Sequence, residues 1–174
     1  MQLLHIQAHA PNARGFGLTE ALCVLALTAI GAAWGLSSWQ IGVQKAKVQA
    51  AREGFVHGLQ WARIQAIQQG VDLQMVRATD CTGLSAQASD WRCGWRVTTL
   101  DGQTLSQQGL PEGVAMLHNL RTDKLSINRR GEPGTVGDSF VFRPLNDLRS
   151  QAANTVCISA AGRVRWQSGD RCSS

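Results

Sequence analysis

The sequence predicts an α+β protein in which one long N-terminal helix is followed by a β-rich, antiparallel C-terminal head. Three observations support this fold class. Residues 16–44 contain a single charged residue, apolar residues then continue at helical spacing to about residue 69, and short strand-like runs follow Gly70. A chain of 174 residues fits one such domain, with the head packed on the C-terminal half of the helix.

The apolar segment at residues 16–44 carries only Glu20, and the next charge is Lys45. Its uncharged part, residues 21–43, is long enough to cross a bilayer core of about 30 Å. A secretory signal peptide cleaved near Ala32 or Ala33 and a plain membrane anchor would both account for this hydrophobicity. Neither of them has a use for a carboxylate inside the segment, which is unfavourable in lipid without a partner.

Residues 14–20, RGFGLTE, resemble the type IV prepilin signature, although Gly17 and Thr19 depart from its commonest form. The resemblance implies that a prepilin peptidase removes residues 1–15 by cutting between Gly15 and Phe16, and then methylates the new N-terminus. It also implies that Glu20 pairs with the amino group of Phe16 in a neighbouring subunit during assembly.

Three regions follow from the same resemblance: the leader at residues 1–15, a transmembrane and filament-core half of the helix at 16–44, and a periplasmic head at 45–174. The expected location is the bacterial inner membrane, with a single pass, and a pilus or pseudopilus after assembly. The expected partners at this stage are the prepilin peptidase, the inner membrane and other pilins.

The helix is expected to continue well beyond the apolar segment. Val48, Phe55, Leu59 and Ala66 recur mostly at steps of three, four and seven, and no proline interrupts the stretch before Gly70, a plausible helix stop. A helix over residues 16–69 would be about 80 Å long at 1.5 Å per residue.

The head is expected to contain short antiparallel strands. Hairpin turns are predicted at Asp101-Gly102, Arg130-Gly131 and Ala161-Gly162. The strand-like runs, rich in Val, Leu, Ile, Trp and Thr, are 71–77, 95–100, 103–105, 114–117, 125–128, 139–143, 155–159 and 164–167.

Four of the five cysteines lie in the polar head, which indicates two disulfides and an oxidising compartment such as a periplasm. Pairing between sequence neighbours, Cys81–Cys93 and Cys157–Cys172, is preferred, but three connectivities remain open. Cys23 lies in the apolar segment and receives no role. The cysteines and histidines lack zinc-site spacing, so no metal site is expected.

The sequence carries no motif of a known catalytic site: it lacks G-x-S-x-G, H-E-x-x-H, a P-loop and the Rossmann glycine pattern. Asp101 and Asp138 lie beside glycines and are interpreted as turn residues. We therefore expect neither an enzyme nor a cofactor.

Positive charge is concentrated at the C-terminal end. The chain has a formal net charge of +5, and residues 121–174 hold nine basic and five acidic residues, eight of the nine being Arg. Guanidinium groups favour bidentate contacts with phosphate or carboxylate, although a solvated basic face is the alternative.

Several segments of the head resemble the GspH/FimT family of minor pilins and pseudopilins. Residues 59–67 and 71–73 are similar to that family's helix end and first strand, and residues 127–131, 139–142 and 158–165 to its closing strands. This resemblance implies a type IV pilin fold.

Within the last segment, Gly162, Arg163 and Arg165 match the Gly-Arg-x-Arg motif with which the FimT branch contacts DNA. In a strand the two arginines would point to one face about 6.6 Å apart, comparable to adjacent phosphates. Trp166 is then expected on the opposite face, in the core. Three more arginines, whose positions the sequence does not fix, could extend the patch: Arg143, Arg149 and Arg171.

Two functions follow from these resemblances. One is a minor type IV pilin that binds duplex DNA without sequence specificity, for uptake in natural transformation. The other is a structural GspH-like pseudopilin or tip-priming minor pilin of a type II secretion or type IV pilus system, without DNA binding. A periplasmic domain released by signal peptidase is a third possibility, and only residues 162–165 separate the first two.

Overall fold

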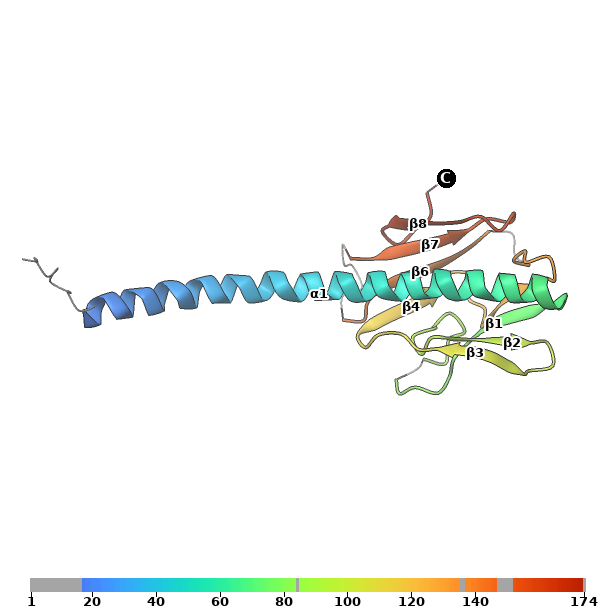
Figure 1. Ribbon diagram of the computed structural model, residues 1–174, viewed down its shortest axis with the longest axis horizontal. Coiled ribbons are helices and arrows are strands. Elements are labelled where there is room, and N and C mark those ends of the chain that lie inside the picture. The colour runs from blue at the N-terminus through green and yellow to red at the C-terminus, as the bar shows by residue number, and fades with distance from the viewer. Residues whose placement is uncertain (1–16, 84, 135–136, 147–151, 174) are drawn as a thin grey trace, which may run out of the picture. The chain divides into compact units, whose positions relative to one another are not determined.

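The computed structural model describes residues 17–83, 85–134, 137–146 and 152–173, without the side chains of residues 32–38 (Figure 1). Contacts divide the chain into two compact units, residues 1–40 and 41–174. The first unit is helical where it is described, and the second holds the rest of the helix and the strands of the head. A membrane span was expected within residues 16–44. No helix in the described part of the chain has the length and hydropathy of such a span.

Helix α1 runs from Leu18 to Gln69 without interruption, close to the expected bounds. Its first turn is closed by the carbonyl of Gly17, which accepts the backbone N–H groups of Glu20 and Ala21. Gly70 ends it with a φ of +66°, a left-handed conformation that glycine adopts with little strain.

The strands form two antiparallel four-stranded sheets. One has the order β3-β2-β1-β5 and the other the order β4-β6-β7-β8. Their bounds are β1 Leu73–Arg77, β2 Trp95–Thr99, β3 Thr104–Gln108, β4 Val114–His118, β5 Lys124–Ile127, β6 Asp138–Pro144, β7 Asn154–Ile158 and β8 Val164–Ser168. This arrangement confirms the α+β pilin-like fold class, with the helix packed on antiparallel sheets.

Both sheets pack on one face of α1. Phe55 of the helix lies 5.3 Å from Trp95 of the first sheet and 4.5 Å from Phe140 of the second, measured between ring centroids. Gly58 allows the close approach of Trp95, because a Cβ atom there would lie 2.8 Å from the indole Nε1. The buried core therefore extends along the helix from Val48 to Ala66.

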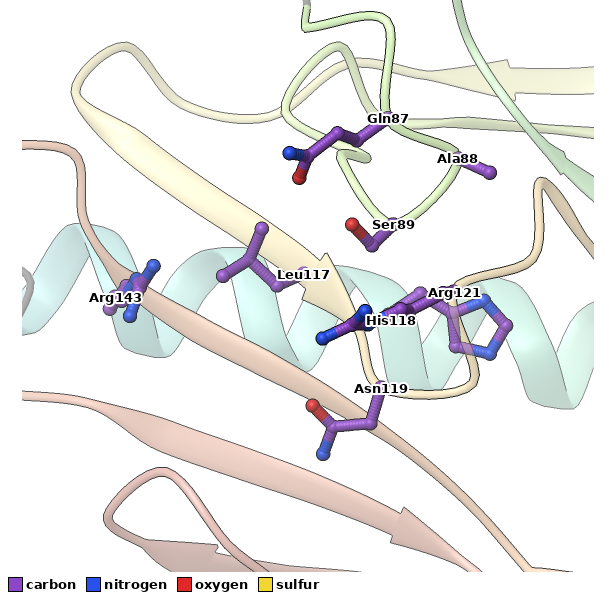
Figure 2. A pocket seen from close by; sticks show the side chains of 8 residues that line it. All are labelled: Gln87, Ala88, Ser89, Leu117, His118, Asn119, Arg121 and Arg143. Carbon is purple, nitrogen blue, oxygen red and sulfur yellow. The ribbon is translucent and has the colours of Figure 1, made fainter.

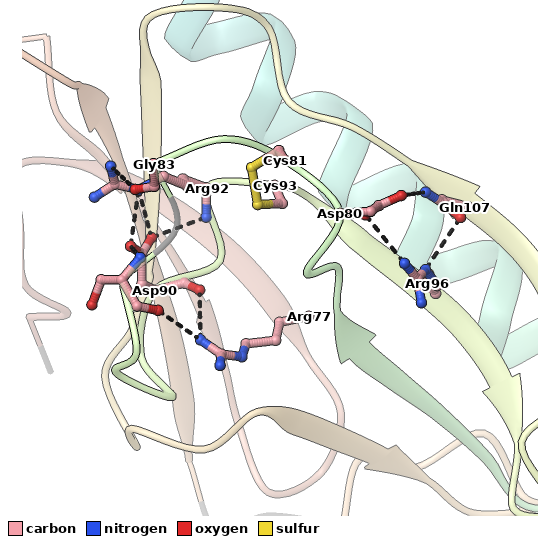
Figure 3. Close-up of a disulfide and its surroundings, with 10 residues drawn as sticks. Arg77, Asp80, Cys81, Gly83, Asp90, Arg92, Cys93, Arg96 and Gln107 are labelled. Atoms are coloured by element: carbon pink, nitrogen blue, oxygen red, sulfur yellow. Dashed lines mark hydrogen bonds and ion pairs between the residues drawn. A yellow bond between two sulfur atoms is a disulfide. The ribbon is translucent and has the colours of Figure 1, made fainter.

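The structure contains both disulfides of the preferred pairing, Cys81–Cys93 and Cys157–Cys172, while Cys23 is free and exposed. The Cys81–Cys93 bridge closes a long loop between β1 and β2 (Figure 3). Arg77 and Arg92 hold that loop in place. Arg77 donates to the carbonyl oxygen of Gln87 at 2.6 Å, and Arg92 forms an ion pair of 2.9 Å with buried Asp90.

Candidate functional site

The β7–β8 hairpin presents the Gly-Arg-Val-Arg segment. The turn closes through the N–H of Gly162, which donates to the carbonyl of Ser159 at 2.8 Å, and the N–H of Ser159, which donates to the carbonyl of Arg163 at 3.0 Å. Gly162 has a φ of +75°, as the expected turn at Ala161-Gly162 requires. In the register of the hairpin, Cys157 of β7 lies directly opposite Arg165 of β8.

Arg63 of α1 fixes this turn to the helix. Its Nη1 donates to the carbonyl of Gly162 at 2.7 Å, and its Nε donates to the carbonyl of Gly131 at 2.6 Å. A Cβ atom on Gly162 would lie 2.9 Å from Nη2 of Arg63 and 3.1 Å from Cδ of Pro133. The glycine is therefore favoured both by the backbone conformation and by the arginine packed against it.

Arg163 and Arg165 are both exposed, and both line one hollow of about 330 Å³. Among the residues that the structure describes, neither of them forms an ion pair. The hairpin thus brings the two guanidinium groups of the motif to one site. The rest of the hollow is formed by Gly137, Asp138, Ser139, Cys157, Ile158, Ser159 and Cys172.

The last described residues lie against β7 and β8. Cys172 is joined to Cys157, and the side chains of Arg165 and Gln167 donate to the backbone carbonyls of Ser173 and Arg171, respectively. The hydroxyl of Thr155 donates to the carbonyl of Gly169 at 2.7 Å. Arg165 therefore helps to hold residues 169–173 in addition to lining the hollow.

Two other arginines of the expected patch, Arg143 and Arg171, do not line this hollow. Arg143 lines a second hollow of about 650 Å³, together with Asn119 and Arg121 (Figure 2). Arg171 is exposed in the C-terminal segment, and Arg149 lies outside the described residues. Among the described arginines, the site consequently centres on Arg163 and Arg165.

Trp166 is not a core residue, contrary to the expectation from strand alternation. Its side chain is 56% exposed, and the guanidinium of Arg52 lies 3.9 Å from the ring centroid. The cause is the place of β8 at the edge of its sheet, where the helix-facing side chain opposite Val156 reaches the margin of the core. The ring and the buried guanidinium form a cation–π contact at that margin.

The sequence also left a buried histidine–aspartate contact unrecognised. Nε2 of His118 lies 2.8 Å from both carboxylate oxygens of Asp138, and both side chains are fully buried. Nδ1 of His118 lies 2.8 Å from the carbonyl of Thr122. Asp138 was expected to be a turn residue; it instead begins β6, and His118 ends β4. The two residues come together only through strand pairing, so local sequence carries no sign of the pair.

Of the residues expected to act in processing and assembly, Glu20 lies exposed in the first turn of α1. Gly15 and Phe16 lie outside the described residues. Within the described ranges, no group of three or more His, Cys, Asp or Glu side chains could hold a metal ion.

Comparison with known proteins gives a family and a fold. Residues 50–162 match the family model of the type II transport protein GspH. No curated protein matches the chain. Two crystal structures of the type IV minor pilin FimU from Pseudomonas aeruginosa (strain PAO1) are similar in fold. The form in space group P65 is 20% identical, with a TM-score of 0.56 over 68% of this chain and 91% of that chain. The P21 form is 18% identical, with a TM-score of 0.58 over 71% and 90%.

Proposed function

The chain belongs to the family of the type II transport protein GspH, and we propose that it is a minor pilin that binds duplex DNA through Arg163 and Arg165. The family itself gives the coarser function, a minor pilin or pseudopilin of a type II secretion or type IV pilus system that assembles with other pilins. Such proteins are structural components and not enzymes.

The observation that carries the proposal is the placement of two exposed arginines on one hollow. Arg163 and Arg165 come from a single hairpin that Arg63 and the Cys157–Cys172 disulfide hold in place. Because the hairpin backbone is already fixed, binding does not have to order the segment that carries the two arginines. Guanidinium groups also match the geometry of phosphate oxygens.

Binding of this kind reads the DNA backbone and not its bases. Contacts to phosphates carry no sequence information, and they release counterions, so affinity falls steeply as salt rises. The proposed role is capture of DNA of any sequence for uptake in natural transformation, with the head exposed on a filament.

The test is a mobility shift of duplex DNA by the full-length protein in mild detergent. We expect the double variant Arg163→Ala with Arg165→Ala to lose the shift, and the wild-type shift to disappear as salt is raised. Arg121→Ala with Lys124→Ala is the matched control, because it removes the same charge from two exposed residues near β5. If the control and the arginine-pair variant bind DNA equally well, these arginines are not the DNA contact.

A second candidate function is a purely structural pseudopilin or tip-priming subunit. One observation favours it: Arg165 already donates to the backbone of Ser173 and so has a role in holding the C-terminal segment. In this case the wild-type protein would not shift DNA at any salt concentration, and the arginine-pair variant would lower only the stability of the head.

The N-terminal region fits the same proposal. Residues 1–15 would be a leader that prepilin peptidase removes between Gly15 and Phe16, and residues 16–44 would lie in the inner membrane before assembly. The head at 45–174 would face the periplasm. Support for the N-terminal part comes from the prepilin-like residues 14–20 and from Glu20, the one charge in an otherwise uncharged stretch. Support for a periplasmic head comes from its two disulfides.

A further inference from the structure

The hollow beside the β7–β8 turn is lined by two serines as well as by two arginines. Ser139 comes from β6, and Ser159 from the residue after β7. Both serines line the hollow together with Arg163 and Arg165. Four side chains that carry hydrogen-bond donors, from three parts of the chain, therefore line one depression.

Each serine oxygen already accepts a hydrogen bond from the protein. The Oγ of Ser159 accepts the backbone N–H of Arg163 at 3.0 Å, and the Oγ of Ser139 accepts the side-chain amide of Asn119 at 2.6 Å. A hydroxyl that accepts in this way keeps its own proton for donation. Each serine can therefore donate one hydrogen bond to a ligand without losing its structural contact.

Asp138 also lines the hollow, but its carboxylate is turned away from solvent and already has hydrogen-bond partners. Its side chain is fully buried, it pairs with Nε2 of His118 at 2.8 Å, and Oδ1 accepts the N–H of Ser139 at 2.7 Å. The exposed charges of the hollow are thus the two guanidinium groups. An anionic group with several acceptor oxygens is the complementary ligand.

We propose that this hollow is a seat for one phosphate group, which accepts hydrogen bonds from the hydroxyls of Ser139 and Ser159 and is neutralised by Arg163 and Arg165. The inference rests on the proposed function where that phosphate is part of a DNA backbone. It adds two neutral donors to the arginine pair and makes one phosphodiester the anchoring point of the strand. The neighbouring phosphates of the strand would then contact side chains outside the hollow.

The experiment compares full-length variants in mild detergent at fixed salt. Ser139→Ala with Ser159→Ala should weaken binding of duplex DNA by at least about a hundredfold, since each substitution removes a hydrogen bond to a charged group. Ser139→Thr with Ser159→Thr keeps both hydroxyls and should bind nearly as the wild type does. Ser106→Ala with Ser126→Ala, which changes two exposed serines of the other sheet, is the control and should have no effect.

A second measurement uses the wild-type protein and no DNA, so its outcome does not depend on whether a variant folds. Titration of inorganic phosphate into the wild-type protein should shift the backbone amide resonances of Ser139, Ser159, Arg163 and Arg165, and leave those of β3 unchanged. If the wild type binds DNA while the alanine variant binds as strongly and phosphate shifts none of these resonances, the phosphate seat is refuted and the proposed function stands. If phosphate binds at these residues but DNA does not bind, the seat stands and the proposed function is refuted.

Discussion

Gly162 is the residue at which the turn, the helix and the arginine motif meet. Its φ of +75° disfavours a side chain, and a Cβ atom there would force the guanidinium of Arg63, 2.9 Å away, to shift. Gly162→Ala therefore adds the strain of a left-handed alanine, about 1 kcal/mol, to the loss of the charged hydrogen bond from Arg63, about 1.5–3 kcal/mol. We expect its free energy of unfolding to fall by roughly 2–4 kcal/mol in urea denaturation.

Gly102 provides the matched control for that prediction. It sits in the β2–β3 turn with a φ of +91°, and no atom lies within 4 Å of the position its Cβ would take. Gly102→Ala therefore carries the backbone strain alone, and it should lower the free energy of unfolding by only about 1 kcal/mol. Equal losses in the two variants would contradict the role assigned to Arg63.

Asp80 gives the head a predictable response to acid. The hydrogen bond from Gln107, together with the neighbouring guanidinium of Arg96, holds the pKa of this exposed carboxyl below its ordinary value of 3.8 (Figure 3). In the unfolded chain the pKa returns to that value. The contribution of Asp80 to stability is therefore present above pH 3.8 and is lost as the pH falls through the lower folded pKa.

Asp80→Asn removes this contribution. Unfolding measured between about pH 5 and about pH 2 should show a shallower loss of stability for Asp80→Asn than for the wild type. Asp123→Asn is the control, because Asp123 is an exposed aspartate that forms no ion pair with the described residues. A wild-type slope in the Asp80 variant would show that the Gln107 and Arg96 contacts do not persist in solution.

For single residues, the sequence predicted the site only where the residues involved are adjacent in the chain. Gly162, Arg163 and Arg165 are contiguous, so their pattern could be recognised and their common face worked out from strand geometry. Ser139 and Arg63 reach the same site from a different strand and from the helix. Their contribution depends on pairing between distant segments, for which a single sequence holds no sign.

At the scale of elements, helix α1 lies close to β2 because Gly58 of the helix has no side chain. A Cβ on Gly58 would lie 2.8 Å from Nε1 of Trp95 and 3.2 Å from two of its ring carbons, and that indole is only 2% exposed. Gly58→Ala should therefore destabilise the head by about 1–3 kcal/mol through overpacking, despite the better helix propensity of alanine.

A glycine-to-alanine substitution elsewhere on the helix should not destabilise the protein. Gly42 has no atom within 4 Å of its would-be Cβ, so Gly42→Ala should leave stability unchanged or raise it by up to about 1 kcal/mol. Thermal unfolding followed by circular dichroism would compare the pair. If both variants are stabilised, Trp95 does not pack against the helix as the structure has it.

The helix and the strands could be predicted closely because the hydrophobic pattern changes at Gly70, from helical spacing to short strand-like runs. Apolar residues at helical spacing indicate α1, and short runs bounded by glycine and aspartate indicate the strands. What the periodicities could not provide was the order of the strands within two sheets. That order puts β8 at an edge, and for this reason Trp166 is exposed although its alternation was that of a core residue.

At the scale of the whole molecule, family and fold agree on an assembly subunit. The GspH match covers residues 50–162, which lie wholly within the compact unit 41–174. The function of the N-terminal region therefore rests on different evidence, namely the prepilin-like residues 14–20 and the single charge at Glu20. The two parts of the proposal can fail separately, and they need separate tests.

The test of the N-terminal region is the identity of the mature chain. When the full-length protein is produced with a prepilin peptidase, mass spectrometry should find a chain of residues 16–174 that carries one methyl group on Phe16. Gly15→Leu should stay uncut, because the peptidase is expected to require glycine before the scissile bond. A chain that begins after Ala32 or Ala33 would instead identify a signal peptide. It would remove Glu20 from the mature protein and exclude assembly through that carboxylate, while leaving the arginine pair of the head untouched.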